Sequence, residues 1–139
     1  MYILVFYEIY KYMNPPFLQT ILIIIQIIVS FGVYNVWIIR KNKPSRYRGG
    51  SHSKTLQEEF QAYGLSDNLR NLVGFLKLSF ASLLLLGIWI PNLTKISALG
   101  IAILMIGAIS MHAKISDPLS KSIPALSMLV MTLFIILFA

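Results

Sequence analysis

The sequence predicts an all-α fold, namely an integral membrane four-helix bundle with a short amphipathic interfacial helix in the first loop. Hydrophobic residues make up 57% of the chain and charged residues only 12%, about half the charged fraction of an ordinary soluble domain. Apolar blocks of membrane-spanning length also follow one another, separated by short polar or proline-containing turns. We therefore expect lipid to be the solvent of the helices, and residues 1–139 to form one membrane domain.

The first span is expected at residues 17–39. These residues carry no charge and, at about 1.5 Å per residue, form a helix of about 35 Å, longer than the roughly 30 Å hydrocarbon core. Trp37 stands just before Arg40, the order typical of a helix that leaves lipid for head groups. One stripe at helical spacing is expected to face the other helices: Gln19, Gln26, Ser30 and Val33.

Residues 1–12 are rich in aromatic side chains but too short to span a bilayer. We expect an interfacial segment or a mobile end. Met13 is an alternative start of the protein, in which case residues 1–12 would not be translated.

Residues 40–67 form the one long polar stretch, a basic loop. Thr55 and Glu58 have the spacing of a capping box, and Gly64 supplies a stop. Between them Leu56, Phe60 and Tyr63 recur at helical spacing. The pattern predicts a short amphipathic helix lying along the membrane surface.

Three more spans are expected, at residues 68–90, 96–113 and 122–139. Ser66 and Asp67 are suitable caps for the second span, and Pro91 ends it. The third span is rich in Gly, Ala and Ser, which let helices approach closely in lipid. The fourth span is the shortest for its task, since about 27 Å of helix barely crosses the hydrocarbon core.

The charge distribution predicts the orientation. If all four spans cross, nine of the twelve Lys and Arg residues lie on the side of the basic loop, while Lys11 and Lys95 lie on the other side and Lys77 lies within a span. The positive-inside rule places the basic loop in the cytoplasm and both termini outside. We expect a multi-pass membrane protein in this orientation.

Several function classes are disfavoured by composition. The chain has no cysteine, which excludes disulfides, thiolate metal sites and iron–sulfur clusters within it. The net charge of +7 is explained by orientation and anionic lipid, and no nucleic-acid motif accompanies it. No catalytic motif or metal-ligand spacing is present, so we expect no enzyme, no metal and no cofactor.

Four segments stand out along the chain: YNVWIIRKNKPSRYRGGSHSKTLQEEFQAYGL, NLVGFLKL, GIWIP and LMIGAISMHAKISDPLSKSIPA. Through them the chain, from Met13 onward, resembles the DoxX-like family of small four-helix membrane proteins. Its most specific pieces are Tyr63-Gly64-Leu65, Gly107 to His112, Asp117-Pro118 and Pro124. The resemblance implies a membrane subunit, as in thiosulfate:quinone oxidoreductase, or a protein that assists the assembly of partners. Together with the absence of organelle-targeting features, it also implies a bacterial plasma membrane as the location. It also implies an acidic residue near position 77 in many members, where this chain has Lys77.

Three polar residues are the candidate binding residues. Lys77 lies about 13 Å into the second span, where a cation costs at least ~2–3 kcal/mol. It either snorkels or contacts a carbonyl, Glu58, Glu59 or Asp117, or else it binds an anionic or quinone-like ligand. His112 is an interfacial hydrogen-bonding residue or a proton-relay or quinone contact, with Asp117 nearby.

Three functions follow as hypotheses. The leading one is a non-catalytic subunit or assembly factor of a membrane complex, with the bilayer and either partner membrane subunits or copies of itself as partners. The second is a redox-linked protein that binds quinone or another small lipophilic ligand through Lys77 and His112. The third is a small-solute transporter, which the few polar groups in the spans disfavour.

Overall fold

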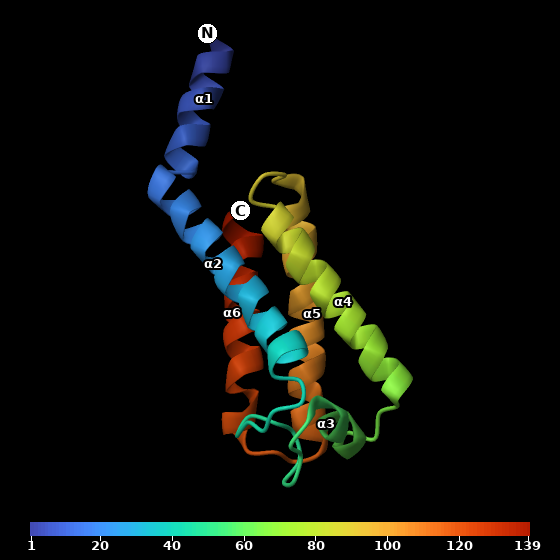
Figure 1. Cartoon of the computed structure of the whole chain (residues 1–139). Coiled ribbons are helices and arrows are strands. Elements are labelled where there is room, and N and C mark those ends of the chain that lie inside the picture. The colour runs from blue at the N-terminus through green and yellow to red at the C-terminus, as the bar shows by residue number, and fades with distance from the viewer.

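The computed structural model describes all 139 residues as helices and connections, without strands. Four helices are long and apolar enough to cross a membrane, which confirms the predicted fold class. Figure 1 shows α2, α4, α5 and α6 side by side. The elements are α1 (Tyr2–Met13), α2 (Pro16–Tyr34), the π-helix η1 (Asn35–Ile39), α3 (Leu56–Ala62), α4 (Asp67–Leu86), α5 (Asn92–Lys114), the 3-10 helix η2 (Leu119–Ser122) and α6 (Ile123–Phe138).

The two ends of the bundle differ. The connection after η1, helix α3 and the α5–α6 turn gather at one end, which we call the loop end (Figure 1). The α4–α5 turn and the C-terminus lie at the other end, and α1 projects beyond the bundle on that side. Every residue of α1 from Tyr2 to Tyr12 is exposed.

The bundle buries small and polar residues among its apolar core side chains, while many large apolar residues lie on its outer surface. Ser30, Thr132 and Ala81 are fully buried, whereas Phe31 and Phe75 are 60% and 68% exposed. In water such a surface would be an unusually large apolar patch, but in hydrocarbon close packing of small residues and hydrogen bonds hold helices together. This distribution fits a bundle surrounded by lipid.

Hydrogen bonds join α2 to α4 in the interior. Ser30 donates to the carbonyl of Ala81 at 2.9 Å, and the Gln26 amide donates to the carbonyl of Leu84 at 3.1 Å. The predicted inward stripe is therefore correct for Gln26, Ser30 and Val33. It is wrong for Gln19, which is exposed and donates to the carbonyl of Asn14, while the neighbouring Leu18 packs against the core instead.

The turn between α4 and α5 begins earlier than predicted. Helix α4 ends at Leu86 and not at residue 90, and α5 begins at Asn92 and not at residue 96. Thr94 explains the difference, since its hydroxyl donates to the carbonyl of Gly87 at 3.1 Å. A Cβ on Gly87 would lie 2.5 Å from that hydroxyl, so glycine permits the tight turn.

Helix α3 has the predicted cap and the predicted buried face, but that face meets protein rather than lipid. The Thr55 hydroxyl accepts the Glu58 N–H at 3.2 Å. Phe60 packs edge-on against Trp37, with ring centroids 5.7 Å apart, and Tyr63 packs similarly on His112. The apolar face therefore closes the loop end, because aromatic residues of η1 and α5 offer it a packed surface.

Candidate functional site

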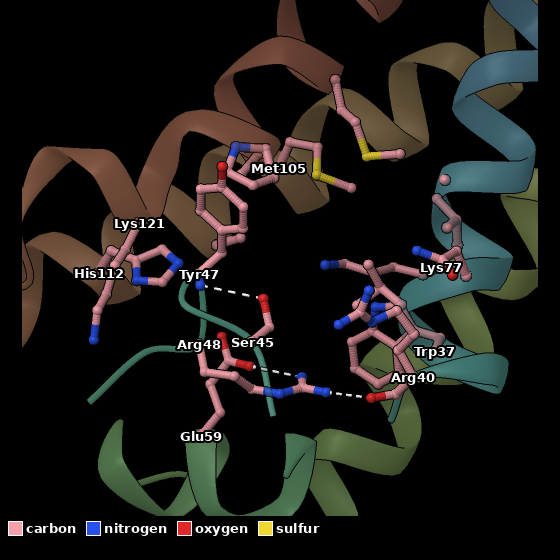
Figure 2. Close-up of a pocket in the computed structure, with 18 of the residues that line it drawn as sticks. Trp37, Arg40, Ser45, Tyr47, Arg48, Glu59, Lys77, Met105, His112 and Lys121 are labelled. Carbon is pink, nitrogen blue, oxygen red and sulfur yellow. Dashed lines mark hydrogen bonds and ion pairs between the residues drawn. The ribbon is translucent and has the colours of Figure 1, made fainter. Parts of the chain in front are cut away.

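A cavity of about 670 Å³ lies between α2, η1, α5 and α6, and the loop residues 44–48 border it at the loop end. Polar side chains line it near that end and apolar ones deeper in the bundle, as the close-up in Figure 2 shows in part. The apolar wall consists of Gly32, Val33, Val36, Trp37, Met105, Ala108, Ala125 and Met128.

Lys77 of α4 lines this cavity. Its side chain is only 8% exposed, and its ammonium lies 5.2 Å from the centre of the Trp37 ring, a cation–π contact (Figure 2). It forms no salt bridge; Glu59 pairs with Arg48, and Asp117 pairs with His112. An intramembrane cation without a directly paired carboxylate is unfavourable, which makes Lys77 a candidate functional residue.

The position of the Trp37 side chain depends on η1 and on Gly74. The π-helical turn, a feature often found at functional sites, ends α2 with Trp37 buried rather than facing lipid. A Cβ on Gly74 would lie 2.8 Å from the Trp37 ring, so the indole lies against the bare backbone of α4. Lys77 stands one turn further along that helix and reaches the same ring.

Arg48 anchors the loop that borders the cavity. It is 6% exposed, pairs with Glu59 at 3.1 Å, and donates to the carbonyls of Arg40 at 2.6 Å and Lys43 at 3.2 Å. Its Nε is buried without a partner. The next residue, Gly49, lies so close to the Tyr63 ring that a side chain would collide with it.

His112 and Asp117 tie this loop to the α5–α6 turn. The imidazole Nδ1 lies 2.7 Å from Asp117, which also accepts the N–H of Gly50 at 3.2 Å. Lys121 donates to the carbonyl of Gly50 at 2.8 Å. Gly50 has φ +84°, a conformation that favours glycine.

Tyr63 links Glu59 to this cluster. Its hydroxyl donates to Glu59 at 2.7 Å and lies 3.5 Å from both ring nitrogens of His112. Burial, reinforced by the nearby Glu59 charge, raises the pKa of the Tyr63 hydroxyl far above its ordinary value. The phenol is therefore neutral and acts as a hydrogen-bond donor.

The structure brings His112 into contact with Asp117, at 2.7 Å, but only two of the three candidates from the sequence line the cavity. Lys77 and His112 both line the cavity, whereas Asp117 lines a separate polar hollow of about 680 Å³ on the outer side of the loop. Sequence reasoning missed Trp37, Arg48 and Tyr63 as site residues. The adjoining Gly49-Gly50 pair was the only available signal that Arg48 precedes a tightly packed loop.

The cavity is strongly cationic. Glu59 is its one carboxylate, and it already accepts from Arg48 and Tyr63. No group of three or more His, Asp or Glu side chains has the arrangement of a metal site. The arrangement is suited to binding an electron-rich group next to an apolar body. Five cationic side chains line the cavity: Arg40, Arg46, Arg48, Lys77 and Lys121.

Comparison with known proteins gives one match. The model of the DoxX-like family matches residues 50–135, from the loop through most of α6. Neither the curated proteins nor the solved structures contain a significant match. The match covers more than half of the chain and includes Lys77, His112 and Asp117. It begins at residue 50, whereas the resemblance in the sequence is expected from Met13 onward. The chain therefore belongs to the DoxX-like family and is a small multi-pass membrane protein.

Proposed function

We propose that the protein binds a small lipophilic ligand in the cavity between α2, α5 and α6. The observation that carries this proposal is the buried Lys77 ammonium, which faces the cavity without a hydrogen-bonding or ionic partner. A ligand that accepts a hydrogen bond from it would offset the unfavourable burial of the charge.

The size and lining of the cavity support the proposal. Its volume of about 670 Å³ is typical of small-molecule sites, which combine apolar walls with a few polar groups. A quinone fits this description, since its carbonyl oxygens accept hydrogen bonds. In the deeper part of the cavity Gly32 and Met128 lie close together, since a Cβ on Gly32 would lie 2.5 Å from the Met128 terminal methyl group.

A role as a subunit or assembly factor is a second proposal, supported by α1. This helix contains no buried residue, although most of its side chains are aromatic or aliphatic. We propose that it contacts a membrane partner. Co-purification in mild detergent tests this: loss of the same partner on deletion of residues 1–12 supports it, and an unchanged set of co-purifying proteins contradicts it.

We also propose the bacterial plasma membrane as the location, with the loop end in the cytoplasm. Membership of the DoxX-like family supports the location. Charge supports the orientation, because five basic residues lie at the loop end, where the positive-inside rule expects cytoplasm: Arg40, Lys41, Lys43, Arg46 and Arg48.

Trp37 offers a direct test of ligand binding. In a Trp89→Phe background it is the only tryptophan, and bromine on a bound molecule quenches it at short range. We expect 11-bromoundecanoate to quench Trp37 in a saturable manner. Ala108→Phe, which fills the cavity, should abolish this quenching, whereas Ala113→Phe on the exposed side of α5 should preserve it. Equal quenching in both variants would contradict the proposal.

A further inference from the structure

We infer that the cavity selects an oxyanion on a hydrocarbon chain, a carboxylate or a phosphate, and that Lys77 recognises the oxyanion. This inference rests on the proposed ligand binding and names the chemical class of the ligand. Neutral head groups such as alcohols or quinones would be bound less tightly.

Charge is the first argument. Five cations and one carboxylate line the cavity, and that carboxylate, Glu59, accepts hydrogen bonds from Arg48 at 3.1 Å and Tyr63 at 2.7 Å. The other nearby acid, Asp117, is bound to His112. Lys77 thus has no directly paired carboxylate, and an anion in the cavity compensates its charge better than a neutral acceptor does.

A second argument comes from Arg48. Its side chain is more than nine-tenths buried beside the cavity, and its Nε has no partner. A buried hydrogen-bond donor without a partner is rare in folded proteins. The Arg48 guanidinium also adds a second cationic group at the same end of the cavity as Lys77.

The polarity gradient is the third argument, and it gives the orientation. Arg40, His112 and Lys121 line the loop end of the cavity, and Gly32, Met105 and Met128 line it deeper in their helices. An amphiphile would therefore lie with its head toward the loop end and its chain toward the bundle centre. Lipids of the adjacent leaflet have the same orientation, so a ligand can enter from that leaflet without turning over.

The test compares head groups on one chain. Trp37 quenching is titrated with 11-bromoundecanoate, 11-bromoundecyl phosphate, 11-bromoundecanol and the corresponding trimethylammonium compound. We expect the two anions to bind about tenfold or more tightly than the alcohol, because hydrogen bonds that involve charged groups are stronger than those between neutral groups. The carboxylate and phosphate arms distinguish a fatty-acid-like from a phospholipid-like head, and inorganic phosphate tests whether the chain is needed.

Substitutions of Lys77 test whether this residue causes the preference for anionic head groups. Lys77→Gln should remove the preference for anions, and Lys77→Arg should retain it. Lys41→Gln is the matched control, because Lys41 lines a different groove on the far side of Trp37. Equal affinity for alcohol and anions, or an anion preference that survives Lys77→Gln, would overturn this inference. If instead Ala108→Phe leaves quenching unchanged, ligand binding itself is refuted.

Discussion

The Nδ1 atom of His112 lies 2.7 Å from Oδ2 of Asp117, and both side chains are only 6% exposed. The same carboxylate accepts the N–H of Gly50. One acidic side chain therefore joins the end of α5 to the loop that borders the cavity.

Asp117→Asn should loosen this connection. The amide keeps the size of the side chain but loses charge-assisted hydrogen bonds, so we expect a loss of about 1–3 kcal/mol, visible as a lower thermal midpoint in detergent. Asp67→Asn is the control, because its ion pair with Arg70 is half exposed and is worth about 0–1 kcal/mol. Similar midpoints for the two variants would argue against a structural role for Asp117.

Lys77→Met should stabilise the ligand-free protein. Methionine has a similar length and removes an unpaired charge from the bundle, so an increase of about 1–3 kcal/mol in unfolding free energy is expected. The same variant should lose its affinity for anionic amphiphiles. Chemical denaturation in detergent measures the first effect, and a clear destabilisation would mean that Lys77 has a structural partner.

Gly74→Ala should displace Trp37. Alanine is favoured over glycine in helices by about 1 kcal/mol, but here the new Cβ would lie 2.8 Å from the indole ring. We expect a lower thermal midpoint and a shifted emission maximum in the Trp89→Phe background. Gly107→Ala is the control, since nothing lies within 4 Å of its Cβ position; it should be neutral or stabilising.

Tyr63 should resist ionisation. Because burial and Glu59 raise its pKa above the ordinary value of about 10, its contribution to stability is fully present below about pH 10 and is lost as pH rises further. Tyrosinate absorbance below pH 12 should be the same in the native protein and in Tyr63→Phe. Tyr2→Phe, at an exposed position, should lose one tyrosinate equivalent; an equal loss in Tyr63→Phe would show that Tyr63 ionises normally.

Orientation can be measured with single cysteines, since the chain has none of its own. Ser51→Cys lies in the loop and Asn92→Cys at the opposite end. With a membrane-impermeant maleimide on intact cells, we expect labelling at position 92 and protection at position 51. The reverse pattern would place the loop end outside.

The sequence was sufficient for the four helices but not for the cavity. Hydropathy and turn residues located the helices because each property is local, and the errors at residues 86–96 arise from the Thr94–Gly87 hydrogen bond, which depends on the fold of the turn. Trp37 has the sequence signature of an interfacial anchor, yet the π-helical turn and the bare Gly74 surface bury it. Arg48 belongs to a run of basic residues, and only its contacts distinguish it from the others.

Crystals grown in a lipidic mesophase with 11-bromoundecanoate would test the central claim most directly. The account predicts an anomalous bromine peak deep in the cavity near Gly32 and Met128, with the carboxylate in hydrogen-bonding contact with Lys77 Nζ. A bromine peak found only on the outer surface of the bundle, or a Lys77 ammonium bonded to Glu59 with no ligand beside it, would contradict the account.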